Sequence, residues 1–152
     1  MIGLISDTHG LLRPEALEAL RGAETILHAG DVGRPEILDE LRKIAPVVAV
    51  RGNIDTEKWA AALPETAILG SIYVIHDVKQ LTHTPPGINI VVSGHSHRPG
   101  QQERGGVLYI NPGSAGPRRF RLPITVARLY LEGRRVEFVD LTPNTNPTRT
   151  SI

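Results

Sequence analysis

Residues 2–9 have the sequence IGLISDTH, in which a short apolar run ends abruptly at Asp7. Apolar runs of about four to eight residues that end at turn signals are typical of buried β-strands. Two later segments have the same form, ETILHAGD at residues 24–31 and VVAVRGN at residues 47–53. In each of them the apolar part ends near a glycine that is followed by Asp31 or Asn53. The first third of the chain therefore predicts three strands.

Two segments with helical spacing lie between these strands, and both begin with proline. Pro14 opens PEALEALRG, in which Leu17 and Leu20 fall on one helical face and Gly22 can end the helix. Pro35 opens PEILDELRKI. Proline is favoured in the first turn of a helix, where its missing N–H would have no partner anyway. The alternation of strands and helices predicts an α/β fold with a parallel sheet.

The second half of the chain is richer in strands than in helices. Strands are expected in ILGSIYVIH (68–76), INIVVSGHSH (88–97), GVLYINPGS (106–114), ITVARLYL (124–131) and RRVEFVDL (134–141). Glu132-Gly133 predicts a hairpin turn between the last two. We expect a single domain over residues 1–142, built from two packed sheets with helices outside, and a polar C-terminal tail over residues 143–152.

The composition excludes several classes of protein. With 17 basic and 16 acidic residues in 152, the formal charge of +1 shows no general bias toward nucleic acid or anionic membranes. The absence of cysteine excludes disulfides, zinc fingers, iron–sulfur clusters and thiol nucleophiles. No apolar stretch approaches the roughly 18 residues of a membrane span, and no basic segment precedes an apolar one at the start. We therefore expect a cytoplasmic protein without a membrane partner.

Side chains that can bind a metal follow five successive predicted strands. They are Asp7 and His9, Asp31, Asn53 and Asp55, His76, and His95 and His97. Ligands of open α/β sheets lie beyond the carboxyl ends of the strands, where the loops converge. Gly30, Gly52 and Gly94 each directly precede a candidate ligand, so the backbone can turn sharply there.

The mixture of carboxylate, amide and imidazole groups suits Mn, Fe(II), Co, Ni or Zn better than Ca or Mg alone. We therefore expect a centre of two divalent cations. Such a centre would attract an anion and stabilise negative charge on a phosphoryl oxygen.

In chain order, the motifs are Asp7-Thr-His9, Gly30-Asp31, Gly52-Asn53-Ile-Asp55, His76, Gly94-His95-Ser-His97 and Asn111-Pro-Gly-Ser114. This ordered set resembles the calcineurin-like metallophosphoesterases. More narrowly, it is similar to the small single-domain phosphodiesterases related to the retromer subunit of the same fold. The resemblance implies a four-layer α/β/β/α sandwich, two mixed sheets flanked by helices, with a dinuclear metal centre.

The resemblance also implies a role for each ligand. The first metal would be held by Asp7, His9 and His97, and the second by Asn53, His76 and His95. Asp31 would bridge the two metals. Asp31 and Asn53 are the expected catalytic residues, and Asn53 is also expected to touch the substrate phosphate.

The expected function is that of a metal-dependent phosphoesterase, a phosphodiesterase rather than a monoesterase, in which a metal-bridging hydroxide attacks phosphorus in line. The expected metal is Mn²⁺, with Fe, Co, Ni and Zn as alternatives, and the expected substrate is a small phosphodiester. Two other functions stay open: a catalytically weak interaction scaffold of the same fold, and a nucleotide or nucleic-acid phosphohydrolase. The second is less favoured because aromatic residues, at 4%, offer few surfaces for base stacking. Self-association into a homo-oligomer is also left open.

Three features depart from the pattern of the family. Ile54 stands where many members have a histidine directly after the asparagine. A general acid typically contributes about 10²–10⁴-fold to a rate, so we expect good leaving groups to be preferred and alkyl monoesters to react weakly. Asp77 replaces the usual small residue after His76, and the segment 77–89 is short. Val78 stands where many relatives have a further histidine.

The remaining polar residues have simpler expected roles. Asp55 is expected to support the ligands or the turn rather than to bind metal. We expect His28, inside an apolar strand, to be a hydrogen-bonded core residue, and His83 to be an exposed loop residue. For Arg118, Arg119 and Arg121 we expect a solvated loop, with contact to a substrate anion or to another subunit as the alternative.

Overall fold

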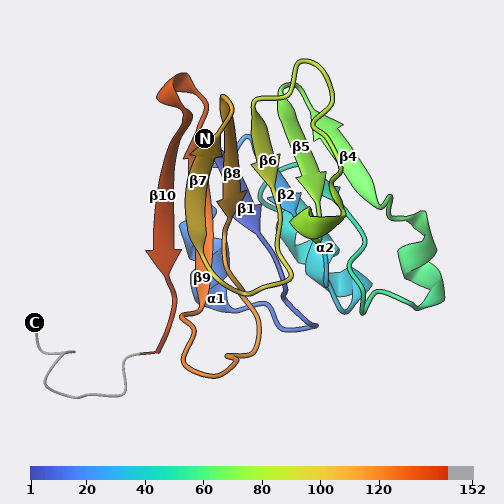
Figure 1. Cartoon of the computed structure of the whole chain (residues 1–152). Coiled ribbons are helices and arrows are strands. Elements are labelled where there is room, and N and C mark those ends of the chain that lie inside the picture. Colours follow the sequence, from blue (N-terminus) through green and yellow to red (C-terminus); the bar gives the residue numbers. More distant parts are fainter. Residues whose placement is uncertain (144–152) are drawn as a thin grey trace, which may run out of the picture.

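The apolar run at the start of the chain forms β1 (Ile2–Ile5), and all four of its residues are buried. In the computed structural model, which describes residues 1–143, β1 is the central strand of a five-stranded sheet (Figure 1). It pairs in parallel with β2 (Thr25–His28) and antiparallel with β9 (Thr125–Tyr130). Ile2 and Leu4 pack into one apolar core and Ile5 into another. This strand is apolar throughout because both faces of its sheet are covered.

Two mixed sheets make up the molecule. The first has the order β10-β9-β1-β2-β3 and is completed by β3 (Val47–Ala49) and β10 (Arg135–Asp140). The second has the order β4-β5-β6-β8-β7, with β4 (Thr66–Leu69), β5 (Ile72–Ile75), β6 (Ile90–Val92), β7 (Gly100–Arg104) and β8 (Val107–Asn111). The sheets face each other across a core that includes Leu4 and Leu27 of the first and Val74, Ile90 and Ile110 of the second. The predicted sandwich of two mixed sheets is confirmed.

Both α-helices cover the outer face of the first sheet. The helices α1 (Pro14–Ala19) and α2 (Pro35–Arg42) begin at the two prolines, as expected. Leu20, directly after α1, and Leu41 of α2 are fully buried against Ile5 and Ile26 of the sheet. The two connections β1-α1-β2 and β2-α2-β3 thus bring the carboxyl ends of three parallel strands to the same edge.

In the part of the chain that the structure describes, no α-helix covers the outer face of the second sheet, and the long side chains of its strands shield one another there. Val91 lies in register between Tyr73 and Tyr109 and is fully buried. The Arg104 guanidinium lies 4.5 Å from the centre of the Tyr109 ring. Figure 1 looks onto this face and shows the single-turn 3₁₀ helix η2 (Val78–Gln80) in front of the end of β5. Because η2 is the only helical turn in the segment 77–89, the helical layer on this side is minimal.

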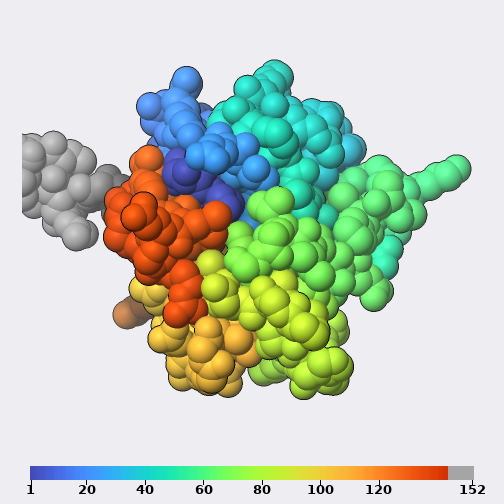
Figure 2. All heavy atoms as spheres, turned by 90° about the horizontal axis from the view of Figure 1, so that it is seen from above, coloured from blue at the N-terminus to red at the C-terminus, as the bar shows by residue number. Residues whose placement is uncertain are grey.

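The remaining elements lie at the ends of the sandwich. The predicted hairpin between β9 and β10 is present, with η3 (Glu132–Arg134) at its turn, and η1 (Lys58–Ala62) follows β3. Figure 2 views the end opposite the carboxyl ends of β1 and β2, where the start of the chain lies between the β9–β10 turn and the β4–β5 segment. Within residues 1–143, no helix has the length and apolar character needed to cross a bilayer. The expected polar tail, after its first residue, lies outside the described residues.

Candidate metal centre

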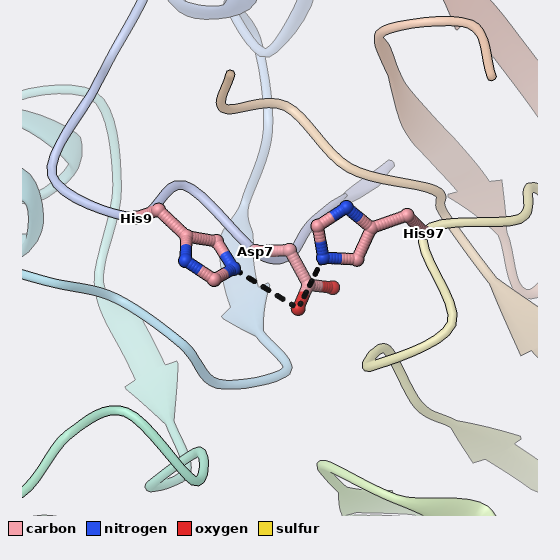
Figure 3. A group of neighbouring side chains, drawn as sticks. All are labelled: Asp7, His9 and His97. Atoms are coloured by element: carbon pink, nitrogen blue, oxygen red, sulfur yellow. Dashed lines mark ion pairs between the residues drawn. The ribbon is translucent and has the colours of Figure 1, made fainter. Parts of the chain in front are cut away.

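The first group of strand-end residues gathers around Asp7 (Figure 3). The Oδ1 atom of Asp7 lies 3.9 Å from His9 Nε2 and 3.5 Å from His97 Nε2. Its Oδ2 atom accepts hydrogen bonds from the Ser6 hydroxyl at 2.7 Å and from the backbone N–H of His95 at 3.1 Å. Asp7 is therefore held through one oxygen and directs the other between two imidazole rings.

This arrangement fits a divalent cation. Asp7 Oδ1 and His9 Nε2 are buried and have no hydrogen-bond partner among the described residues. Burying a polar atom is costly unless another group satisfies it. Ligand atoms lie about 2.0–2.2 Å from an ion such as Zn²⁺, so two ligands of one ion are roughly 3–4 Å apart. One cation held by Asp7, His9 and His97 would satisfy both buried atoms.

A second group comes from four different strand ends. Asp31 follows β2, Asn53 follows β3, His76 follows β5 and His95 follows β6. Asn53 Oδ1 lies 2.9 Å from His76 Nε2 and 3.2 Å from His95 Nδ1. Asp31, His76 and His95 each direct one ligand atom to within 4.8 Å of the others. Asp31 and His76 are buried whereas Asn53 and His95 are exposed, so this second group is open to solvent.

Asp31 joins the two groups. Its Oδ2 atom lies 3.4 Å from His9 Nε2 in the first group and 3.4 Å from His76 Nε2 in the second. Its Oδ1 atom accepts a hydrogen bond from the backbone N–H of Ile54 at 3.1 Å. A single carboxylate oxygen placed between two histidine groups fits a ligand shared by two cations.

The surrounding hydrogen bonds set the protonation of His76. Its Nδ1 lies 2.7 Å from the carbonyl oxygen of Ala29 and donates to it, so Nε2 is the atom left facing Asp31 and Asn53. A backbone carbonyl at the far nitrogen is the usual way in which a protein fixes the tautomer of a metal-binding histidine.

Asp55 supports the site without joining either group. Its carboxylate accepts backbone N–H bonds from Val32 at 3.1 Å, Gly33 at 3.0 Å and Gly52 at 2.9 Å. These bonds tie the loop after β2 to the loop after β3, which carry Asp31 and Asn53. The structure thus gives Asp55 the supporting position expected from the sequence.

The charges of the site follow from these contacts. Burial alone would raise the pKa of Asp7, but the imidazoles of His9 and His97 and the Ser6 hydroxyl hold it well below its usual range. Burial likewise opposes ionisation of Asp31, and His76 together with the Ile54 N–H lowers its pKa. Burial disfavours the charged form of His76, yet the Asp31 carboxylate raises its pKa. Both carboxylates are therefore anionic at neutral pH, as cation ligands must be.

The backbone at the site is strained. Left-handed φ angles occur at five candidate ligands: Asp7 (55°), His9 (47°), Asp31 (57°), His95 (72°) and His97 (64°). Non-glycine residues rarely adopt this region, and such outliers cluster at functional sites.

Two glycines allow the loops to approach each other closely. A Cβ atom on Gly52 would lie 2.1 Å from Asp31 Oδ1, and one on Gly94 would lie 2.0 Å from Ser6 Oγ. The Gly94 Cβ would also lie 2.6 Å from Asp7 Oδ2, so a side chain at either position would displace Asp31 or Asp7, which explains why glycine precedes Asn53 and His95.

Three residues that support Asp7 and Gly94 were not assigned this role from the sequence. Ser6 binds Asp7 as described above, and the Ser114 hydroxyl donates to the backbone carbonyl of Asp7 at 3.0 Å. Asn111 Nδ2 donates to the carbonyl of Gly94 at 3.0 Å. Only their places at strand ends, next to Asp7 or in the Asn111–Ser114 turn, marked them in the sequence. Which backbone group each one binds depends on loop geometry that no local pattern reveals.

Other polar residues lie away from both groups. His83 is exposed, and its ring contacts the Thr82 hydroxyl at 3.2 Å. The Arg118 guanidinium donates to the carbonyl oxygen of Leu122 at 3.1 Å and so holds its own loop. Arg119 and Arg121 are exposed.

A cavity of about 450 Å³ opens onto the second group. Its lining includes Asn53, His76, Asp77 and His95. A larger cavity of about 740 Å³ lies at the opposite end of the sandwich, next to Met1, Leu69 and Tyr130, and neither of the two histidine groups contributes to its lining. The smaller cavity, rather than the larger one, is therefore the place where a ligand would meet the candidate metal-binding groups.

Comparison with known sequences points to one superfamily. The model of the calcineurin-like phosphoesterase superfamily domain matches residues 1–134. A probable metallophosphoesterase of Methanothermobacter thermautotrophicus is 35% identical, over 90% of this chain and 89% of its own. The phosphodiesterase YfcE of Escherichia coli is 32% identical, over 72% of this chain and 76% of its own.

Solved structures show the same fold. The structure of an archaeal phosphodiesterase superimposes with a TM-score of 0.79 at 23% identity, covering 92% of this chain and 99% of that one. Vps29 from Entamoeba histolytica, as a D62A mutant, superimposes with a TM-score of 0.68 at 24% identity, covering 93% and 99%. The paired sheets, the two histidine–aspartate groups and the match over residues 1–134 agree, and the chain belongs to the calcineurin-like phosphoesterase superfamily.

Proposed function

We propose that the protein is a phosphodiesterase that uses two divalent cations, with Mn²⁺ as the expected metal. The observation that carries this proposal is the position of Asp31, whose Oδ2 lies 3.4 Å from a histidine of each group. Two separate structural sites would not need a common carboxylate. The names of relatives support the reaction class, since YfcE is a phosphodiesterase.

Each group would hold one cation. Asp7, His9 and His97 would bind the first, and Asn53, His76 and His95 would bind the second, with Asp31 shared. Two divalent cations held there would act as Lewis acids, which would activate water as a nucleophile and neutralise negative charge on the phosphoryl group. The buried side of the centre is closed by the first group, so the substrate phosphate would enter at the exposed second group.

Asn53 would touch the substrate. Its Oδ1 faces His76 and His95, which leaves its amide nitrogen as a donor for a phosphoryl oxygen. Ile54, 40% exposed, offers no proton to a leaving group. Aryl esters, whose leaving groups depart without protonation, should therefore react better than alkyl esters.

The test is hydrolysis of bis(p-nitrophenyl) phosphate with added Mn²⁺. Replacing a shared or direct ligand should lower kcat/KM by more than about 100-fold, because loss of even a supporting contact costs about 10–100-fold at metal sites. The variants are Asp31→Ala and His95→Ala. Matched controls are Asp39→Ala on the exposed face of α2 and His83→Ala in the exposed loop, which should keep the wild-type rate.

Activity retained by Asp31→Ala would overturn the mechanism. A wild-type protein that binds no metal and shows no activity with Mn²⁺ would favour the scaffold alternative. Hydrolysis of oligonucleotides far faster than of small aryl diesters would favour the nucleic-acid alternative.

A further inference from the structure

Asp77 occupies an unusual position at the rim of the second group. It directly follows His76 at the end of β5, and it lines the 450 Å³ cavity together with Asn53 and His95. Its Oδ1 accepts a hydrogen bond from the backbone N–H of Lys79 at 3.1 Å, which caps the η2 turn. Its Oδ2 lies 4.0 Å from His95 Nε2. The cap therefore fixes the carboxylate in an orientation that faces the outer nitrogen of a candidate ligand.

The two nitrogens of His95 have different neighbours. Nδ1 lies 3.2 Å from Asn53 Oδ1, on the side of the second group, whereas Nε2 lies on the side of Asp77. A carboxylate that accepts a hydrogen bond from the outer nitrogen of a metal-binding histidine fixes its tautomer and its ring orientation. Asp77 faces that nitrogen of His95 at 4.0 Å, which is an electrostatic contact rather than a hydrogen bond. Asp77 is thus placed to position His95.

The charge of Asp77 is also less compensated than that of its neighbours in the cavity. Glu65 pairs with Arg51 at 3.1 Å, and the Asp55 carboxylate accepts three backbone N–H groups. Among the described residues, the ion-pair partner of Asp77 is the imidazole of His95 and no lysine or arginine. The negative charge of Asp77 therefore lies in the lining of the cavity through which a phosphate ester would reach the second group.

We propose that Asp77 sets the substrate class of this site, positioning His95 and favouring singly charged phosphodiesters over doubly charged phosphomonoesters. The proposal rests on the proposed phosphoesterase function. A phosphomonoester carries close to two negative charges above its second pKa of about 6, whereas a phosphodiester carries one. At a separation of several ångströms near a protein surface, one additional unit of repulsion changes affinity by about tenfold.

Three variants separate charge from positioning. Asp77→Asn removes the charge but keeps an oxygen that can accept from the Lys79 N–H and a polar group that faces His95. Asp77→Ala removes both the charge and the acceptor. Asp39→Asn removes the same charge from an exposed position on α2 and serves as the control.

The main measurement compares p-nitrophenyl phosphate with bis(p-nitrophenyl) phosphate at pH 8 in Mn²⁺. These substrates share a leaving group and differ in charge. Asp77→Asn should raise the monoester-to-diester ratio of kcat/KM by about tenfold, and Asp39→Asn should leave it unchanged. A ratio for Asp77→Asn within twofold of wild type would overturn the proposal.

Two measurements need no turnover. Calorimetry on the Mn²⁺-loaded protein should show inorganic phosphate gaining affinity relative to diethyl phosphate in Asp77→Asn, again by about tenfold. Chelator competition should show weaker Mn²⁺ binding in Asp77→Ala, by about 10–100-fold, and a smaller change in Asp77→Asn. If wild type hydrolyses neither substrate, the proposed function fails, and the binding ratio still decides the role of Asp77.

Discussion

At the scale of single residues, His28 shows how a buried imidazole is kept neutral. It lies fully buried in β2, where Gly30 N–H donates to its Nδ1 at 3.1 Å. Its Nε2 then carries the proton and donates to the Thr8 hydroxyl at 3.0 Å, which in turn donates to the Val32 carbonyl. Burial lowers the pKa of His28 to about 4, although nearby carboxylates oppose this shift. The expectation of a hydrogen-bonded core histidine agrees with this environment.

This histidine should make the fold sensitive to acid. The folded state binds the proton only near pH 4, whereas the unfolded state binds it near pH 6.5, so protonation favours unfolding between these values. The stabilisation that neutral His28 gives to the folded state is fully present above pH 6.5. About 3 kcal/mol of the free energy of unfolding is lost as the pH falls to 4. Urea unfolding in a chelator at pH 7.5 and pH 5 should therefore show a smaller loss for His28→Gln than for wild type.

The control for this measurement is His83→Gln, which changes an exposed imidazole and should follow the wild-type profile. Parallel profiles for wild type and His28→Gln would show that His28 does not carry this pH dependence.

At the scale of elements, the loop after β6 depends on the absence of a side chain at Gly94. A Cβ there would meet Ser6 Oγ at 2.0 Å and Asp7 Oδ2 at 2.6 Å, whereas Gly100 at the start of β7 has open space. Gly94→Ala should weaken Mn²⁺ binding at least tenfold and lower the free energy of unfolding by about 2 kcal/mol. Gly100→Ala should change stability by no more than about 0.5 kcal/mol. Chelator competition measures the Mn²⁺ affinity, and urea unfolding measures the free energy of unfolding. Equal values for Gly94→Ala and Gly100→Ala in both measurements would contradict this prediction.

Elements with a strong local pattern were predictable from the sequence. β1, β2 and β3 follow from their apolar runs, and α1 and α2 begin at the prolines that predicted them. β7 was not predicted, because all five of its residues are exposed and it has no hydrophobic period. It forms through ladder pairing with β8, which is a tertiary contact. The short turns η1 and η2 likewise have no apolar repeat to mark them.

The sequence predicted which residues would meet at the candidate site better than it predicted the contacts between them. The order of polar residues at strand ends indicated which side chains would meet, and the structure brings Asp7, His9 and His97 together and Asp31, His76 and His95 together. The sequence left Asp77 as an unexplained departure, because its contact with His95 depends on how the η2 turn folds back over the end of β5. Distances across two sheets are not encoded in any single segment.

At the scale of the whole molecule, the candidate centre connects the two sheets. Asp7, His9 and Asp31 follow strands of the first sheet, while His76, His95 and His97 follow strands of the second. A cation bound by both sets stabilises the folded state and not the unfolded chain. At 100 times Kd, binding adds about 2.7 kcal/mol, which corresponds to a rise in Tm of roughly 5–10 °C for a chain of this size.

Thermal unfolding with excess Mn²⁺ and with chelator should reveal this difference in the wild type. Asp31→Asn, which weakens a ligand shared by both groups, should show a much smaller rise. A Tm that is the same with Mn²⁺ and with chelator would show that the sheets are not coupled through bound metal.

The left-handed backbone at five candidate ligands also has an evolutionary consequence. Each of these residues holds a conformation that glycine would adopt at less cost, by about 1 kcal/mol or more. In a lineage that no longer binds metal, replacing these ligands with glycine or asparagine would therefore relieve backbone strain. Descendants that kept only the fold would in this way lose the metal ligands while their backbone became less strained.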